Sequence, residues 1–101
     1  MSPAVLSPLA RRDLLDALRW IAQDNQAAAR ALHHSVIKAA QHIGEHNHFG
    51  VPRPDLAGPP YRFVILTGFP YVVVYNADRR PPMIVRILHG ARDLPEILRD
   101  L

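Results

Sequence analysis

Several polar side chains in the C-terminal half of the sequence are of the types that cleave RNA. Such cleavage needs a group that activates the ribose 2′-hydroxyl, a proton donor for the leaving oxygen, and cations for the phosphate. The residues with these properties are Arg62, Tyr75, Arg86, His89 and Arg92. In a regular strand every second side chain lies on the same face, so Arg86 shares a face with Ile84 and Leu88, whereas His89 lies on the other face. We therefore expect Arg86 and His89 to lie on different faces, which argues against a nuclease.

Each of these residues also has a structural interpretation. A histidine at a strand end, such as His89, is typical of a side chain that only hydrogen-bonds to its surroundings. Arg86 and Arg92 are suited to pairing with a carboxylate, either of a partner or of the region around Asp93 and Glu96. Tyr75 fits packing or a partner contact better than proton donation.

A second pattern has the spacing of a metal site. The stretch from His42 to His46 reads H-x-x-E-H, the inverted zincin motif, which places two imidazoles one helical turn apart. Gly44 weakens the helix that would carry them, and no later helix offers an obvious third ligand. The sequence has no cysteine, so thiolate ligands, cysteine nucleophiles and disulfides are excluded. We expect neither a metal site nor another cofactor.

Length and composition predict one domain over residues 1–101, with enough apolar residues (49%) for one core. The net charge is +3, and eleven of the twelve cationic residues are arginine, which suits bidentate contacts to carboxylate or phosphate. These arginines are spread along the chain, so acidic protein partners are favoured over direct DNA binding. The N-terminus lacks the features of a signal peptide and no stretch is apolar enough to span a membrane, so we expect a cytoplasmic protein.

The apolar pattern predicts the order of the elements that position these side chains. Residues 4–6 allow a short strand, and Ser7-Pro8 has the types of a helix N-cap and first helical position. Spacings of three and four predict an antiparallel hairpin of helices, the first over residues 8–23 and the second from about residue 26. Prolines and glycines predict a loop over residues 44–60. Runs at 61–66, 71–75 and 83–88 then predict strands joined as antiparallel hairpins, and residues 93–101 allow one or two helical turns.

The predicted strands are apolar on both faces. One strand places Tyr71, Val73 and Tyr75 on one face and Val72 and Val74 on the other. The last strand is expected to place Ile84 and Leu88 opposite to Val85 and Ile87. If both helices cover the same face, the second face keeps an apolar strip that a monomer would rarely leave in water. We therefore expect a partner segment to lie on that second face.

Four local patterns occur together in one order. They are residues 6–14 (LSPLARRDL) with 20–22 (WIA), Asp24-Asn25 before an alanine-rich helix, Glu45-His46 with 50–56 (GVPRPDL), and 85–94 (VRILHGARDL). In this order the sequence resembles, nearly end to end, the ParE branch of the ParE/RelE toxin superfamily. The last pattern, R-x-L-H-x-x-R-D, is the most specific of the four.

The resemblance implies an α+β fold of order β-α-α-β-β-β, with a helical hairpin packed on a small antiparallel sheet. It also implies the toxin of a type II toxin–antitoxin system, bound and neutralised by a cognate ParD-like antitoxin, with DNA reached only through that antitoxin. ParE-like members inhibit DNA gyrase, whereas RelE-like members cleave mRNA on the ribosome. The closer likeness to ParE favours a gyrase inhibitor without enzymatic activity. A toxin-like co-repressor that has lost its activity is a third interpretation.

Candidate contact residues are assigned on the basis of this resemblance. Those for the antitoxin are Leu15, Arg19, Trp20, Tyr71, Val73, Tyr75 and Arg86, and those for the target are His89 and Arg92. In the ribonuclease alternative the catalytic set is Arg62, Arg86, His89 and Arg92. Trp20 lies at the edge of the buried stripe of its helix, where it either closes the helical hairpin or offers a flat apolar surface to a partner.

Overall fold

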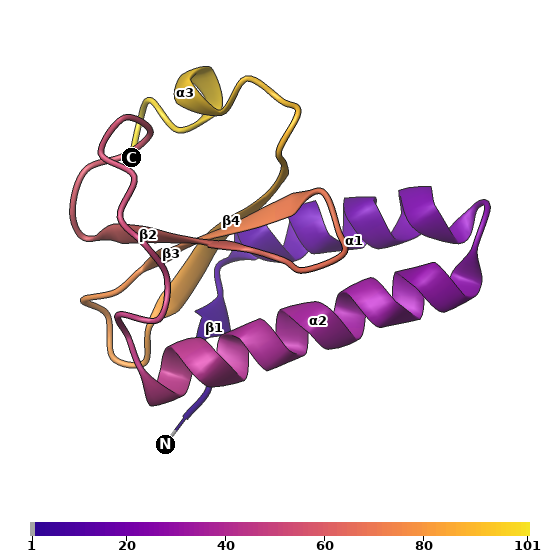
Figure 1. Cartoon of the computed structure of the whole chain (residues 1–101), viewed down its shortest axis with the longest axis horizontal. Coiled ribbons are helices and arrows are strands. Elements are labelled where there is room, and N and C mark those ends of the chain that lie inside the picture. The colour runs from indigo at the N-terminus through magenta and orange to yellow at the C-terminus, as the bar shows by residue number, and fades with distance from the viewer. Residues whose placement is uncertain (1) are drawn as a thin grey trace.

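The computed structural model describes residues 2–101, which form a four-stranded sheet with two long helices packed on one side (Figure 1). The elements are β1 (Val5–Leu6), α1 (Pro8–Ala22), α2 (Gln26–Glu45), β2 (Tyr61–Ile65), β3 (Tyr71–Asn76), β4 (Met83–His89) and α3 (Leu94–Ile97). The strand order in the sheet is β1-β4-β3-β2. The predicted α+β class and element order are confirmed. The sheet is mixed, because β1 pairs with β4 in parallel while the other pairs are antiparallel.

Both long helices begin at the predicted N-caps. The Ser7 hydroxyl accepts a hydrogen bond from the Ala10 N–H (3.0 Å) and donates to the Val85 carbonyl (3.1 Å), so it joins the start of α1 to β4. The Asn25 side chain accepts from the Ala28 N–H (3.0 Å) at the start of α2. These side chains satisfy N–H groups that have no partner within the first turn of a helix.

The second helix continues through the glycine at which we expected it to stop. A Cβ on Gly44 would collide with the backbone of Ser2 and Pro3, which cross the helix there. Gly44 therefore serves a close approach between two segments, and the loop begins only after Glu45.

The sheet separates two apolar clusters. Tyr71, Val73, Tyr75 and Ile84 lie on the helix side, packed with residues of α1 and α2 such as Leu32.

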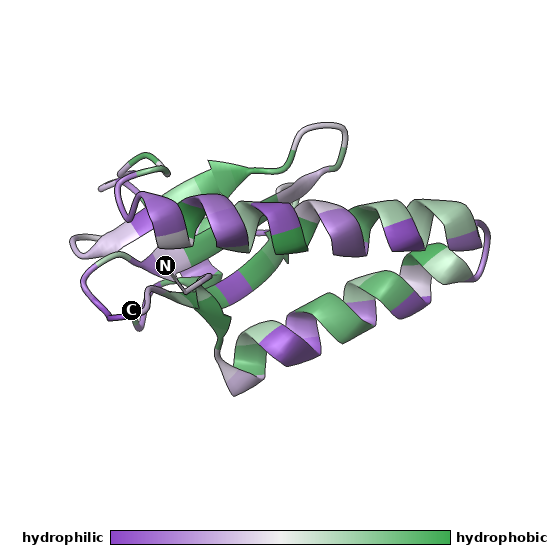
Figure 2. Ribbon diagram, turned by 90° about the horizontal axis from the view of Figure 1, so that it is seen from below, coloured by the Kyte–Doolittle hydropathy of each residue, from purple (hydrophilic) through white to green (hydrophobic). Residues whose placement is uncertain are grey.

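None of the helices over residues 2–101 is long and apolar enough to cross a membrane. In Figure 2 the strands are largely hydrophobic, while the two long helices alternate between hydrophilic and hydrophobic residues, as expected for helices with one buried side.

The second face of the sheet is closed in part by the chain itself, which corrects our expectation of an open apolar strip. Phe63, Val74 and Leu88 are buried there, and they pack with Ala57 from the long loop and Leu98 from the C-terminal segment. Figure 1 shows α3 and the loop before β2 on the side of the sheet opposite to α1 and α2. The part that stays open lies over β2, where Ile65 is 72% exposed.

Candidate functional site

Arg86 is held by a carboxylate of α1. Its Nε and Nη2 atoms donate to the two carboxylate oxygens of Asp13 at 2.8 and 3.1 Å, and the Ile87 N–H donates to the same group at 3.0 Å. The two side chains are 17% and 10% exposed. Hydrogen bonding to Asp13 raises the pKa of Arg86 above its usual range. Arg86 therefore has an internal partner, but this partner is Asp13 of α1 and not the region around Asp93 and Glu96 that we expected.

A β-bulge changes which residues of β4 share a face. Tyr75 pairs with Ile84 while Val74 pairs with Arg86, so Val85 has no opposite residue. One extra residue inverts the alternation of all side chains that follow.

The expected placement of Ile84 with Leu88 on one face of β4, and of Val85 with Ile87 on the other, is therefore wrong. Ile84 and Ile87 both belong to the helix-side cluster, whereas Val85 and Leu88 pack on the second face. His89 lies opposite Tyr71, with ring centroids 5.3 Å apart. Arg86 lies opposite Val74 of the second-face cluster, whereas Tyr71 belongs to the helix-side cluster. Arg86 and His89 therefore start from different faces of β4, as expected, although the Arg86 guanidinium reaches Asp13 on α1.

A small polar hollow lies between α1 and the C-terminal end of β4. Its volume is about 200 Å³ and its lining residues are Asp13, Asp16, Ala17, Trp20, Tyr71, Ile87, His89 and Arg92. Trp20 is 71% exposed, so it does not close the helical hairpin and instead presents its ring at the surface. We call this site the Trp20 hollow. It brings Trp20, assigned to the antitoxin, together with His89 and Arg92, assigned to the target.

The other residues assigned to the antitoxin divide between surface and core. Leu15 and Arg19 are exposed on α1. Tyr71 is 8% exposed, and Val73 and Tyr75 are fully buried between the sheet and the helices. With no exposed side-chain surface, Val73 and Tyr75 offer nothing to a partner in this conformation.

Tyr75 instead holds the loop that precedes β2. Its hydroxyl accepts a hydrogen bond from the Gly50 N–H (2.7 Å) and donates to the Asn47 carbonyl (2.8 Å). Arg62 Nη1 donates to the Gly50 carbonyl at 2.7 Å, from the neighbouring strand. A Cβ on Gly50 would lie 2.7 Å from the Tyr75 ring, so only glycine fits this approach. Burial raises the pKa of the Tyr75 hydroxyl.

We expect Tyr75→Phe to lower the free energy of unfolding by about 1–3 kcal/mol, because the buried Gly50 N–H and the partly buried Asn47 carbonyl both lose their partner. The change should also alter the response to alkaline pH. A phenol whose pKa is higher in the folded chain than in the unfolded chain stabilises the fold below the unfolded pKa, and this stabilisation is lost as pH rises through the folded pKa. Urea unfolding at pH 7 and at about pH 11 should therefore show a smaller alkaline loss in Tyr75→Phe than in the parent. An equal loss in both proteins would contradict this assignment, and Tyr61→Phe is the control.

The alternative catalytic residues do not form one cluster. Arg62 lies opposite Tyr75 and His89 lies opposite Tyr71, at the two ends of β3. This separation corresponds to about 13 Å along the strand. Arg62 is bound to a loop carbonyl and Arg86 to Asp13, so both guanidinium groups already have internal partners.

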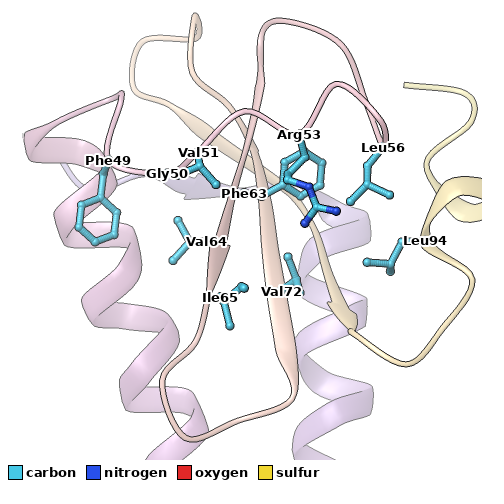
Figure 3. Close-up of a pocket in the computed structure, with 10 residues that line it drawn as sticks. All are labelled: Phe49, Gly50, Val51, Arg53, Leu56, Phe63, Val64, Ile65, Val72 and Leu94. Carbon is cyan, nitrogen blue, oxygen red and sulfur yellow. The ribbon is translucent and has the colours of Figure 1, made fainter.

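The open part of the second face forms an apolar groove over β2 (Figure 3). Its volume is about 330 Å³ and it is lined by Phe49, Gly50, Val51, Arg53, Leu56, Phe63, Val64, Ile65, Val72 and Leu94. Phe49 is 46% and Val51 58% exposed. Arg53 is its single charged lining residue, and it pairs with Asp55 at 2.9 Å on the surface. We call this site the β2 groove.

Sequence reasoning did not single out Asp13, Arg53 or Ile65. Asp13 had a detectable signal, because it falls three residues after Ala10 and four before Ala17, beside the buried stripe of α1. A charged residue in that position indicates a buried partner. Ile65 had no such signal, since an apolar residue in a strand is ordinarily assigned to the core.

The H-x-x-E-H motif spans the end of a helix. α2 ends at Glu45, His46 follows it in extended conformation, and the His42 ring contacts Phe49 with centroids 5.2 Å apart. Within residues 2–101, no three His, Asp or Glu side chains are grouped as a metal ion requires.

Comparisons with known proteins agree with this architecture. A search of curated proteins gave no match. Among solved structures, a chain of the chromosomal ParDE toxin–antitoxin system from P. aeruginosa superposes with a TM-score of 0.68. It covers 88% of this chain and 96% of its own length at 19% identity, a likeness of fold. The family model described as ParE toxin of type II toxin–antitoxin system, parDE, matches residues 4–94. The chain therefore belongs to the ParE toxin family of type II toxin–antitoxin systems.

Proposed function

We propose that this chain is a cytoplasmic toxin that inhibits DNA gyrase and is neutralised when a ParD-like antitoxin binds it. Residues 1–101 act as one toxin domain. Membership of the ParE family implies an antitoxin partner, and inhibition of gyrase is the activity that the resemblance to ParE favours. The chain acts by binding and needs no cofactor.

The Trp20 hollow is the observation that carries a binding role. An exposed tryptophan beside an arginine is the composition of an interface hot spot, because both side chains contribute large contact energies when a partner covers them. Catalysis of RNA cleavage would require the four candidate residues to converge on one phosphate. Arg62 of β2 and His89 of β4 pair with opposite ends of β3, which argues against that alternative.

The purified toxin, freed of antitoxin, is expected to block supercoiling by gyrase and to trap cleaved DNA. Translated mRNA should stay intact in the same preparation. Codon-specific cuts in mRNA with normal supercoiling would contradict the proposal and support the ribonuclease alternative. If neither activity appears and expression without antitoxin leaves growth unaffected, the chain is an inactive co-repressor.

Trp20 was assigned to the antitoxin, but it lines the same hollow as His89 and Arg92, so we extend the proposed gyrase contact to it. Trp20→Ala is expected to weaken gyrase inhibition at least about thirtyfold, the effect of losing a hot-spot residue. The fold should be unaffected, because Trp20 is 71% exposed. Ile37→Ala is the matched control, since Ile37 is an exposed apolar residue on the other long helix (43%). The measurement is the toxin concentration that halves supercoiling. Equal potency of both variants would exclude the Trp20 hollow as the gyrase contact.

A further inference from the structure

The Trp20 hollow has two aromatic walls that do not touch each other. One wall is the Trp20 ring, which α1 presents at the surface with 71% exposure. The other is the Tyr71–His89 pair of β3 and β4, whose rings meet edge to face. Within residues 2–101 the Trp20 ring contacts neither of them, because the ring pairs there are Tyr71–His89 and His42–Phe49. An open space between aromatic side chains is suited to one flat ring, which stacks on them.

Three polar side chains of the hollow are left without an internal partner. Tyr71 is only 8% exposed, yet its hydroxyl makes no hydrogen bond with residues 2–101 and is not sealed from solvent. Asp16 and Arg92 line the same hollow, and neither side chain forms an ion pair within the described part of the chain. Asp13, the other carboxylate there, is already bound by Arg86. The hollow therefore offers a hydroxyl, a carboxylate and a cation to a ligand.

The carboxylate and the tryptophan come from one face of α1. Asp16 and Trp20 are four residues apart, so their side chains are neighbours on the helix surface. A ring that stacks on Trp20 thus has the Asp16 carboxylate within reach of its edge. The volume of about 200 Å³ is below the roughly 300–1,000 Å³ of sites that enclose a whole small ligand. The hollow is therefore suited to a single ring, with the rest of the ligand outside.

We infer that the Trp20 hollow binds a guanine base, with its ring on Trp20, its Watson–Crick edge at Asp16 and the attached phosphate at Arg92. A carboxylate only accepts hydrogen bonds, and guanine has two adjacent donors on that edge, the N1–H and the N2 amino group. Adenine has an acceptor at N1, which the same carboxylate repels. The guanidinium fork of arginine matches the oxygens of a phosphate.

This site goes beyond the proposed function and differs from the ribonuclease alternative. Asp16, Trp20 and Tyr71 are not members of that catalytic set, and guanine is held here as a ligand with no bond broken. Guanine occurs in free nucleotides and in single-stranded nucleic acid, whose unpaired bases stack on aromatic side chains. Both sources present the same ring, edge and phosphate to the hollow.

Fluorescence titration tests the site directly, because Trp20 is the single tryptophan of the chain. Guanosine monophosphate (GMP) added to the antitoxin-free toxin should quench this fluorescence saturably, since the base stacks on the indole. Adenosine monophosphate (AMP) should bind about tenfold more weakly, the discrimination that one bidentate contact to a base provides. A short thymine oligonucleotide with a single central guanine distinguishes the sources. Tighter binding than GMP identifies single-stranded nucleic acid, and weaker binding identifies the free nucleotide.

Two variants assign the contacts. Asp16→Asn should remove the preference for GMP over AMP, because an amide offers one acceptor and one donor group where guanine needs two acceptors. Asp24→Asn is the matched control, since Asp24 is an exposed carboxylate in the turn after α1, and it should keep the preference. Arg92→Gln should weaken GMP binding about tenfold and leave the binding of guanosine, which has no phosphate, unchanged.

Equal affinity of the parent toxin for GMP and AMP would overturn the inference. So would the absence of saturable quenching by GMP and by the guanine oligonucleotide alike, or a preference for guanine that persists in Asp16→Asn. The titrations contain toxin and ligand alone, so their results do not depend on gyrase. A toxin that binds GMP but leaves supercoiling unaffected refutes only the proposed function, whereas one that inhibits gyrase but binds no guanine refutes only the guanine site.

Discussion

Asp13→Ala is expected to lower the free energy of unfolding by about 3–5 kcal/mol, because it leaves the Arg86 guanidinium in a largely buried position without a counter-charge. The carboxylate accepts three hydrogen bonds, two from Arg86 and one from the Ile87 N–H. These bonds join α1 to β4 just beyond the bulge. Urea unfolding at neutral pH measures the loss. A change below about 1 kcal/mol would show that water replaces the carboxylate there.

The double variant Asp13→Leu with Arg86→Met is the matched control. Replacing a buried ion pair by apolar side chains of similar size is often nearly neutral, since neither charge has to be desolvated. The double variant should therefore be more stable than Asp13→Ala, although the Ile87 N–H still loses its acceptor. Arg86→Ala should lose growth arrest only to the extent that the amount of folded protein falls. A catalytic residue would instead lose activity while the protein stays folded.

Leu98→Ala is expected to cost about 2–5 kcal/mol, the usual effect of truncating a fully buried leucine. Leu98 is 1% exposed and packs with Phe63, Val74 and Leu88, and so it holds the C-terminal segment on the second face of the sheet. Leu101→Ala is the control, because Leu101 is 44% exposed, and it should change stability by less than about 0.5 kcal/mol. Thermal unfolding of the isolated toxin measures both variants.

The outcome for Leu98→Ala also decides between two accounts of the second face. If the chain closes this face itself, the variant destabilises the free toxin and exposes Val74 and Leu88. If a partner were needed to cover these residues, free Leu98→Ala would be as stable as the parent, and only the complex would suffer. Equal stability of Leu98→Ala and the parent in the absence of antitoxin would contradict the packing described above.

The helices and strands were predictable because their signals are local. The caps at Ser7 and Asn25 and the apolar spacing within α1 and α2 depend on residues within a few positions of one another. The three later strands begin at the predicted residues, and α3 forms within the predicted C-terminal segment. Gly44 was misinterpreted because its reason is the close approach of Ser2 and Pro3, which are distant in sequence.

The candidate site was predictable only residue by residue. His89, Arg92 and Trp20 were recognised, but their meeting in one hollow depends on α1 running beside β4. The bulge at Val85 exchanges the faces on which the later side chains of β4 lie. A bulge that arises from pairing with β3 leaves no local pattern in the sequence. The partner of Arg86 lies 73 residues away along the chain.

The sequence by itself determined the class of fold, the order of its elements, their caps and the residue types available for binding, because these depend on composition and on spacing along the chain. The tertiary structure decided which faces those residues share, that Arg86 pairs with Asp13, and that loop and tail close most of the second face. The physical reason is that burial and ion pairing depend on distances in space between residues far apart in sequence. In addition, one unpaired residue in a strand changes the face on which the following side chains of that strand lie.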